Sequence, residues 1–400
     1  MIQAVPRAKP DFASIDFDRA PFIVIWETTQ ACDLACVHCR AEAKPWRESG
    51  ELSTAEAKRL LDQVREFGQP LMVLTGGDPL KRPDLFELIR YGDGLGLRMT
   101  LTPSGTRLMT RDVIQKMKDA GLARLAVSLD APTREAHDAF RKVAGSFDWT
   151  VAAIREARAI GLPVQINTTI TRHNQDDVQA LAGLMKTLDI CLWSVFFLVP
   201  TGRGQRNTLV SARKHEEVFN LLYDLTKTMP YDIKTTSAQA YRRVVIQRRK
   251  AEGVASGRPM EAGGWAAPAF LTGKSRAAAD ASTEVARSAK GINDGNGFVF
   301  ISHLGEVCPS GFLPVSAGNV RKRSLVDIYR NSELFRSLRD YTRIKGKCGY
   351  CDFRDVCGGS RSRAYGLTGD VHASDPTCLY VPPKPKAPVD PADEPELIEE

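Results

Sequence analysis

The sequence predicts an α/β fold, built as an open and curled partial barrel of six β/α units. Three observations predict it: six short apolar runs rich in branched residues, a helical period near 3.6 between them, and an end to this alternation near Pro200. Strands that alternate with helices favour a parallel sheet. Six units are too few for a closed eight-stranded barrel, so we expect an open sheet with its chemistry at the carboxyl ends of the strands.

The predicted strands are Phe22–Trp26, Leu71–Leu74, Arg98–Leu101, Arg124–Leu129, Val164–Thr169 and Leu192–Leu198. The first intervening helix has the clearest signal, because Ser53 is followed three residues later by Glu56, the pattern of a capping box. Apolar residues at helical spacing then mark this helix and three others. They are Leu60, Leu61, Val64 and Phe67; Val113, Ile114 and Met117; Ile154, Ala157 and Ile160; and Leu181, Leu184 and Leu188.

Beyond Pro200 the pattern changes. We expect helices over residues 215–228 and 324–340, a strand over Phe298–Ser302 with a hairpin turn after it, and a long Ala/Gly/Ser-rich loop over 251–297. The Pro-rich acidic tail has the composition of a disordered segment. The predicted division is an N-terminal extension (1–20), the partial barrel (21–230), a connecting helix and loop (231–297), a cysteine-rich domain (298–380) and the tail (381–400).

The composition bounds the classes of function. The chain of 400 residues has a net charge of +7, although six acids and no Lys or Arg follow Lys386. A basic body suits an anionic ligand or is simply a solvated surface. The sequence lacks the interleaved aromatic and basic stripe that would indicate nucleic-acid binding. Its apolar stretches are all shorter than a membrane span requires. The N-terminus lacks a signal-peptide pattern, so we expect a cytoplasmic protein, in which nine cysteines favour metal or redox chemistry.

Three cysteines follow the first predicted strand, in the pattern Cys-x3-Cys-x2-Cys: Cys32, Cys36 and Cys39. Three thiolates on one loop can hold three irons of a cubane cluster and leave the fourth iron open, whereas a cluster that only carries electrons normally takes four cysteines. A structural zinc site would also require four ligands. His38 could complete it only nominally, because it lies between two of the ligands. The triplet therefore favours a reactive cluster over zinc.

Polar and glycine residues recur where the predicted strands end. They are Gly76, Gly77 and Asp78 after the second strand, Ser104 after the third, Ser128 and Asp130 after the fourth, Arg141 beyond them, and Asn167 on the fifth. Each alone is explained by a turn, a polar loop or a surface helix. Glycine lets a backbone approach a ligand closely, and a guanidinium suits a carboxylate. Their repetition at strand ends favours a binding site there.

A second cysteine group reads Cys348-x2-Cys351-x5-Cys357, with Cys378 twenty-one positions later. Four thiolates at this spacing make a closed site. The residues alone are compatible with zinc and with an iron–sulfur cluster.

Together these motifs resemble the radical S-adenosylmethionine (SAM) enzymes with a C-terminal SPASM-type domain, over roughly residues 20–380. The resemblance implies that the catalytic cysteines of the first group bind a [4Fe–4S] cluster whose open iron holds SAM. Reduction then yields a 5′-deoxyadenosyl radical that abstracts a substrate hydrogen. It further implies that His38 leans toward the adenine and that Gly76, Gly77 and Asp78 bind the SAM amino group, although the family usually has Glu in place of Asp78. The implied contacts to the SAM carboxylate and ribose are Ser104, Ser128, Asp130, Arg141 and Asn167.

For the second group the resemblance implies an auxiliary [4Fe–4S] cluster on Cys348, Cys351, Cys357 and Cys378. The full SPASM pattern carries seven cysteines and two auxiliary clusters. Here two of the expected ligand positions are Arg323 and Arg361, so we predict one auxiliary cluster. Cys308 belongs to neither group, and three roles are open for it: a substrate contact, a ligand of a variant site, or an inert packed thiol.

The amino-acid sequence around both cysteine groups most resembles the branch that includes the haem synthase of the alternative haem pathway and the haem d1 biosynthesis enzymes. That branch implies decarboxylation of two propionates of iron-coproporphyrin III to vinyl groups, with an auxiliary cluster accepting an electron. Two other hypotheses stay open: a maturase of ribosomally made peptides, and a non-enzymatic iron–sulfur electron carrier. The expected partners are a small-molecule or peptide substrate and a donor such as flavodoxin or ferredoxin, without nucleic acid or membrane.

Overall fold

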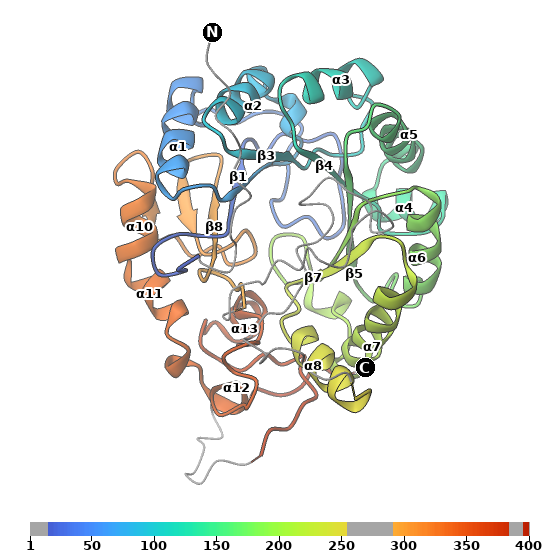
Figure 1. The fold of residues 1–400 in the computed structure, drawn as a ribbon, viewed down its shortest axis with the longest axis vertical. Helices are drawn as coiled ribbons and strands as arrows, with labels where there is room; N and C mark the ends of the chain where they lie inside the picture. Colours follow the sequence, from blue (N-terminus) through green and yellow to red (C-terminus); the bar gives the residue numbers. More distant parts are fainter. Residues whose placement is uncertain (1–14, 254–290, 384–394, 400) are drawn as a thin grey trace.

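The computed structural model describes residues 15–253, 291–383 and 395–399. Among these residues, ten strands form one sheet in the order β10-β9-β8-β1-β2-β3-β4-β5-β6-β7, and the sheet curls into an incomplete barrel with helices outside it (Figure 1). The predicted α/β fold with a parallel sheet is therefore confirmed.

The six strands predicted from the sequence all form, within one or two residues of the predicted bounds, and each pairs in parallel with the next. They are β1 (Ile23–Glu27), β2 (Leu71–Thr75), β3 (Arg98–Leu101), β4 (Arg124–Ser128), β5 (Val164–Ile170) and β6 (Leu192–Phe197). The helices between and after them are α1 (Thr54–Glu66), α2 (Leu85–Gly94), α3 (Arg111–Asp119), α4 (Arg134–Arg141), α5 (Ser146–Ala159), α6 (Val178–Thr187) and α7 (Ala212–Thr228).

The sheet extends beyond the prediction at both edges. After α7, β7 (Asp232–Thr236) pairs in parallel with β6, and its polar sequence gives no strand signal because Ile233 is its only large apolar residue. The helix α8 (Tyr241–Ala251) follows. At the other edge the predicted strand near residue 298 forms as β8 (Phe298–Ile301), which pairs in parallel with β1. A hairpin then leads to β9 (Glu306–Cys308) and β10 (Gly318–Asn319), both antiparallel.

The C-terminal region is helical and irregular. The single helix predicted over 324–340 is two helices, α10 (Leu325–Asn331) and α11 (Glu333–Arg339). Ser332 separates them because its backbone is extended and its side chain caps α11 by accepting from the Phe335 N–H. Two short helices lie within the second cysteine group: α12 (Gly346–Gly349) contains Cys348, and α13 (Arg361–Thr368) lies between Cys357 and Cys378.

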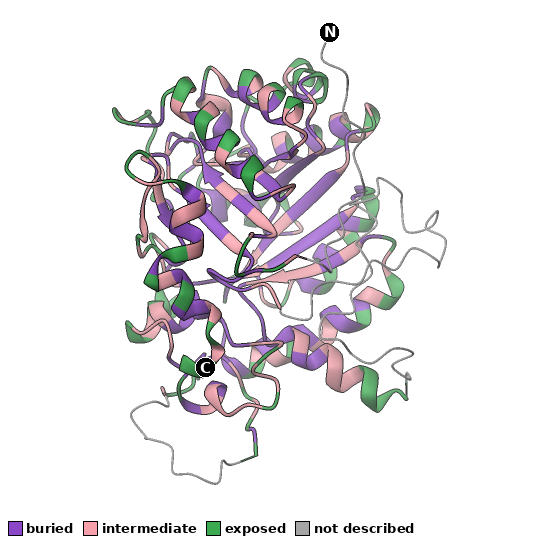
Figure 2. Ribbon diagram, turned by 60° about the vertical axis from the view of Figure 1, so that its left-hand side comes forward, coloured by how far each residue is buried: buried purple, intermediate pink, exposed green. Residues whose placement is uncertain are grey.

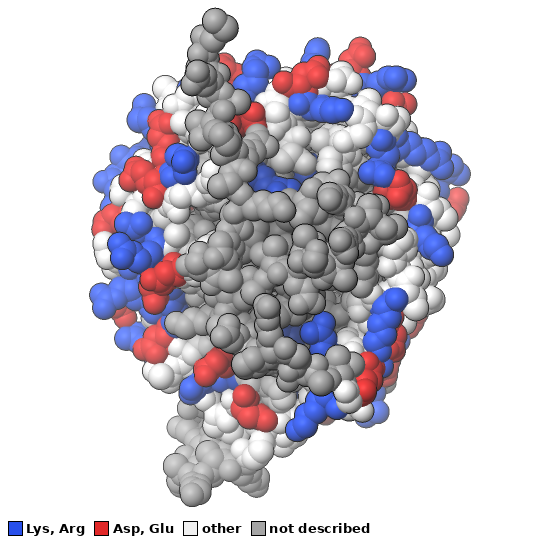
Figure 3. All heavy atoms as spheres, in the orientation of Figure 1, with Lys and Arg blue, Asp and Glu red and all other residues white. Residues whose placement is uncertain are grey.

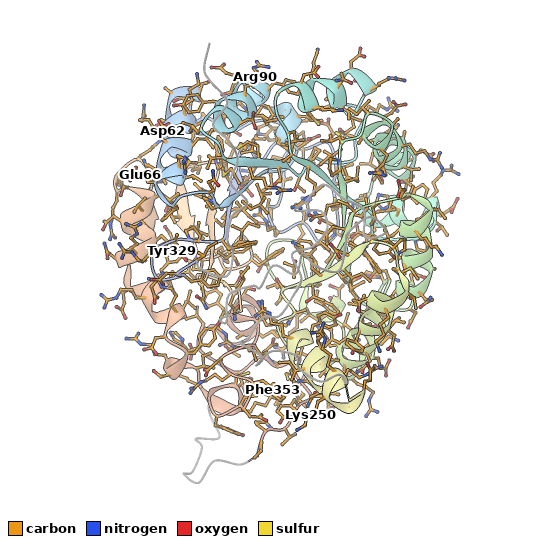
Figure 4. All side chains as sticks on the ribbon, viewed as in Figure 1. Asp62, Glu66, Arg90, Lys250, Tyr329 and Phe353 are labelled. Carbon is orange, nitrogen blue, oxygen red and sulfur yellow. The ribbon has the colours of Figure 1, made fainter. Side chains whose placement is uncertain are left out.

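The core lies between the sheet and the helices that cover its outer face. Buried residues follow the strands and the inner sides of the helices, and exposed residues lie outside (Figure 2). On α1 the predicted apolar face is buried, and the capping box of Ser53 and Glu56 forms. Tyr329 of α10, labelled in Figure 4, packs edge-on against Phe67 with ring centroids 5.5 Å apart. The C-terminal helices therefore share one core with the barrel.

Three predicted segments fall largely outside the described residues: the N-terminal extension (1–20), the loop 251–297 and the tail 381–400. Of the tail, residues 395–399 are described, and Ile398 exchanges backbone hydrogen bonds with Ala212 and Pro376. No helix among the described residues is long and apolar enough to cross a membrane.

Candidate functional site

A cavity of about 490 Å³ occupies the inside of the curled sheet. Inward-facing side chains of β1 to β8 and the first cysteine loop line it. Of the predicted site residues, the cavity brings together Cys32, Cys36, His38, Cys39, Gly76, Gly77, Ser104, Ser128, Arg141 and Asn167. Asp78 and Asp130 are not among the described residues that line it.

The first cysteine group lies at the carboxyl end of β1. Cys32 and Cys36 are buried, and Cys39 is half-buried beside them. The Cys32 Sγ lies 3.2 Å from the Ser104 hydroxyl, and the Arg141 guanidinium donates to the Cys36 Sγ at 3.5 Å. Burial raises the pKa of Cys32 to about 11, so this thiol keeps its proton until a metal displaces it. Buried thiols with donors directed at the sulfur suit ligands of an iron–sulfur cluster.

The geometry of the thiols bears on the kind of metal group they can hold. Within the described residues, no three His, Cys, Asp or Glu side chains converge closely enough to hold a single metal ion. A cubane cluster does not need that convergence, because each thiolate binds a different iron at a corner of the cluster. Three buried or half-buried thiols on one loop are the set of ligands that such a cluster would take.

The two glycines after β2 pack against the backbone that leads into the cysteine loop. A Cβ on Gly77 would lie 2.4 Å from the Gln30 carbonyl oxygen, and one on Gly76 would lie 2.6 Å from that of Thr29. The Gly77 N–H also donates to the Thr29 carbonyl at 2.8 Å. The absence of a side chain at both positions therefore sets how closely the loop approaches β2, in addition to any role toward a ligand.

Asp78 has its carboxylate directed into the protein. It accepts from the Leu80 N–H at 3.1 Å and from the Thr106 hydroxyl at 3.1 Å, so it caps the turn that follows β2. Burial raises its pKa to about 6 despite these donors. The backbone, rather than this carboxylate, is what the β2 turn presents to the cavity.

Asp130 and Arg141 form a buried ion pair below the cysteine loop. The other carboxylate oxygen of Asp130 accepts from the Thr169 N–H at 2.8 Å. Burial opposes the charge on Asp130, but the Arg141 guanidinium outweighs it and holds the pKa of Asp130 below its usual range. Asp130 thus fixes Arg141 in the orientation that brings it to Cys36 and the cavity.

His38 presents a neutral aromatic surface to the cavity. Its ring packs against Phe140 with centroids 4.5 Å apart, and burial lowers its pKa to about 3. On β4 and β5, Ser128 and Asn167 are directly paired in the sheet register, and the Asn167 Oδ1 accepts from Gln165 at 2.6 Å. These side chains line the cavity as neighbouring polar groups.

The second cysteine group encloses a cavity of about 20 Å³ that Cys348, Cys351, Cys357 and Cys378 all line. Backbone N–H groups donate to three of the sulfurs, from Phe353 to Cys351 at 3.4 Å, from Gly359 to Cys357 at 3.4 Å and from Asp375 to Cys348 at 3.5 Å. Donors of this kind tune iron–sulfur clusters. The four predicted ligands are therefore brought together around one small space.

The two arginines at expected ligand positions have separate roles. Arg361 is buried and donates to the Val371 and Ala373 carbonyls at 3.0 and 2.7 Å. Arg323 is half-buried and pairs with Asp327 on α10. Cys308 lies buried on β9, where burial raises its pKa to about 12.

Apart from Arg141, sequence reasoning missed the cationic residues of the cavity. Arg40, Arg124, Lys234, Arg242 and Arg249 also line it, whereas Asp294 is the one acidic side chain among its described lining residues. Lys234 was not predicted to lie in the site, because its strand, β7, was not predicted. The α8 arginines had a detectable signal, since residues 242, 245, 246 and 249 share one helix face.

A thin wall separates the cavity from the second cysteine group. Arg242 lines the cavity and donates to the carbonyl of Val356, the residue before Cys357, at 3.0 Å. Asn293 lines the same cavity and donates to the Gly359 carbonyl at 2.9 Å. The two sites are therefore neighbours across one layer of residues.

Comparison with known proteins gives a consistent result. The Radical SAM superfamily profile matches residues 26–185. An AdoMet-dependent heme synthase of Methanosarcina barkeri is 40% identical and aligns over 92% of this chain and 99% of its own length. One from Oleidesulfovibrio alaskensis is 41% identical over 91% of this chain and 89% of its own. More distantly, a mycofactocin maturase of Mycobacterium tuberculosis is 30% identical over 95% and 88% of the two chains.

Solved structures share the fold at low sequence identity. The crystal structure of Streptococcus suis SuiB bound to S-adenosylmethionine superposes with a TM-score of 0.64 at 15% identity, covering 90% of this chain and 78% of that one.

Proposed function

Because this chain belongs to the radical SAM superfamily, we propose that it is an oxidoreductase that decarboxylates a carboxylated tetrapyrrole, with iron-coproporphyrin III as substrate. The single observation that carries the substrate class is the cavity: it is large, enclosed by the sheet, and lined by more cations than acids. Relatives named heme synthase, at about 40% identity over nearly their full length, support the same assignment.

The chemistry is divided between the bound groups and the chain. A [4Fe–4S] cluster on Cys32, Cys36 and Cys39 would supply the electron that cleaves SAM to a 5′-deoxyadenosyl radical. The protein orients the cosubstrate: Arg141, fixed by Asp130, offers a cation for a carboxylate, and His38 offers a neutral ring for the adenine. The sheet lines the cavity and would hold the substrate beside the site where the radical forms.

The electron balance requires an acceptor. Removal of a β-hydrogen from a propionate, followed by loss of carbon dioxide, leaves a vinyl group and one surplus electron. The second cysteine group supplies the position for an auxiliary [4Fe–4S] cluster that accepts this electron, because only the Arg242 and Asn293 layer separates it from the cavity. An external donor such as flavodoxin or ferredoxin would reduce the first cluster.

A peptide maturase is the second candidate. Its support is the 30% identity to the mycofactocin maturase over most of both chains. The two candidates differ in the ligand that the cavity accepts. A maturase would show no preference for a tetrapyrrole and would act on a precursor peptide instead.

Iron analysis and turnover test the proposal together. Anaerobic reconstitution should give about eight irons per chain. Alanine at Cys32, Cys36 and Cys39 should remove about half, and alanine at the second group should remove the other half. Cys191→Ser is the matched control, because that thiol donates to the Val164 carbonyl and lies outside both groups. The reduced wild type with SAM and iron-coproporphyrin III should yield vinyl products and carbon dioxide. If the porphyrin stays unchanged although the protein holds its full iron content, iron-coproporphyrin III is not the substrate.

A further inference from the structure

The helix α8 presents one face to the cavity and the opposite face to α7. Arg242, Val245, Ile246 and Arg249 line the cavity, at the i, i+3, i+4 and i+7 positions of one helix face. This face has two apolar residues in the middle and an arginine at each end. The two arginines are separated by seven residues, or about 10 Å along the helix axis.

The location of α8 explains why this face is turned inward. The helix follows β7, at one edge of a sheet that does not close, and its inward face lines the same cavity as residues of β7 and β8. Figure 1 shows α8 on the side of the molecule where β7 and α13 lie, and Lys250 in Figure 4 marks its far end. α8 thus forms part of the cavity wall where the barrel is open.

A buried arginine holds α8 from behind. Arg243 donates to Glu216 of α7 at 2.9 Å, whereas Arg248 pairs with Asp224 of the same helix at 2.6 Å in contact with solvent, where an ion pair contributes little to stability. Arg242 is anchored as well, through its bonds to the Val356 and Ile292 carbonyls. The inward face is therefore presented in one fixed orientation.

The chemistry of this face and its neighbours defines what would bind there. Val245 and Ile246 are only half-buried, although they are apolar. Phe196 and Phe312, whose rings lie 6.2 Å apart, line the same cavity with Lys234 of β7. Figure 3 shows basic and acidic side chains interspersed over the outer surface that it displays, whereas the described residues that line the cavity include six Lys or Arg and one acid. A wide apolar ring with carboxylates at its rim matches this arrangement.

We propose that the inward face of α8 is the specificity surface for the substrate, with Arg249 binding a peripheral carboxylate and Val245 and Ile246 contacting the macrocycle. This inference rests on the proposed function and adds the residues that select the substrate. Arg242 contributes its charge while it stays bonded to backbone carbonyls. Arg249 lines the cavity at the end of the helix, where a guanidinium can bind a carboxylate in the bidentate geometry that favours this pair.

Two adjacent arginines provide the test. Arg249→Ala removes the arginine that lines the cavity at the end of α8, and Arg248→Ala removes its neighbour on the outer face as a matched control. The Soret band of iron-coproporphyrin III is titrated with the full chain carrying its clusters. We expect the Kd to rise at least about tenfold in Arg249→Ala, to stay unchanged in Arg248→Ala, and to be partly restored in Arg249→Lys. The tetramethyl ester of the same porphyrin, which has no carboxylates, should bind wild type and Arg249→Ala equally.

The outcomes separate this inference from the proposed function. If wild type binds the porphyrin but Arg249→Ala and Arg248→Ala behave alike, the specificity surface is refuted and the substrate stands. If wild type binds neither the acid nor the ester, the proposed substrate fails, and the inference fails with it. Ile246→Asp, which places a carboxylate in the middle of the face, should weaken binding of the acid more than binding of the ester. An equal effect on both would also overturn the inference.

Discussion

A methyl group added at Gly77 should move the first cysteine loop. The Cβ of an alanine there would lie 2.4 Å from the Gln30 carbonyl oxygen and 2.6 Å from the Ala31 carbonyl oxygen. Both neighbours are backbone atoms of the segment that enters the loop, so no side-chain rotation relieves the contact. Real Cβ atoms essentially never lie closer than 3.0 Å to another heavy atom, so one backbone must shift by about 0.6 Å or more.

The magnitude follows from that displacement. Overpacking at a close-packed site typically costs about 1–3 kcal/mol. The shift also strains two hydrogen bonds that join the β2 turn to the loop, from Gly77 to the Thr29 carbonyl at 2.8 Å and from Asp78 to the Ala31 carbonyl at 2.6 Å. We therefore expect Gly77→Ala to lower the free energy of unfolding by about 2–3 kcal/mol. It should also reduce the iron bound by Cys32.

Gly183→Ala is the control, because Gly183 lies within α6 and a Cβ there would meet nothing within 4 Å. That substitution should stabilise the chain by about 0.5–1 kcal/mol, the usual gain from alanine in a helix. Urea unfolding of the metal-free proteins measures both values, and iron analysis after reconstitution measures the loop. Equal stability and equal iron content in Gly77→Ala and Gly183→Ala would refute the close-packing argument.

Two further predictions concern stability. Burial opposes the charge on His303, but hydrogen bonds to two glutamates outweigh it and raise the pKa of His303 above its ordinary value. Its charged form therefore stabilises the fold fully below the unfolded pKa, and this contribution is lost as the pH rises through the folded pKa. The difference in unfolding free energy between wild type and His303→Gln should shrink as the pH rises above about 6.5, the ordinary pKa of histidine, and a difference independent of pH would contradict the assignment. Arg363 is buried, pairs with Asp375 at 3.2 Å and donates to the Leu198 carbonyl of the barrel. Arg363→Ala should cost about 3–5 kcal/mol in urea unfolding, because it leaves the Asp375 carboxylate buried without its partner. Arg343→Ala, which breaks an exposed ion pair, should lower the free energy of unfolding by less than about 1 kcal/mol. Similar losses in both variants would show that the buried Arg363–Asp375 pair does not join the region of the second cysteine group to the barrel.

The sequence was sufficient for the strands whose side chains are apolar. The second strand formed over Leu71–Thr75, one residue beyond the predicted Leu71–Leu74, because a buried parallel strand is a continuous apolar run. β7 was missed because it is an edge strand with a lysine directed into a cavity. Its identity as a strand depends on pairing with β6, which is a tertiary contact that the local sequence does not encode.

The candidate site was predictable where a sequence motif identifies the site residues directly. The spacing of Cys32, Cys36 and Cys39 located one end of the cavity before the fold was known. The orientation of Asp78 was not predictable, because it depends on the Thr106 hydroxyl twenty-eight residues away. The inward face of α8 needed the structure for the same reason: the helical period identifies a face, but only the open edge of the sheet determines that this face meets the cavity.

The most direct test of the central claim is the release of 5′-deoxyadenosine from the reduced, reconstituted protein supplied with SAM under anaerobic conditions. Wild type should release it, and iron-coproporphyrin III should increase the yield. Cys36→Ala should release none, while Cys351→Ala should retain SAM cleavage and lose conversion of the porphyrin to product. Absence of 5′-deoxyadenosine from wild type with both clusters intact would contradict the account and leave an iron–sulfur electron carrier.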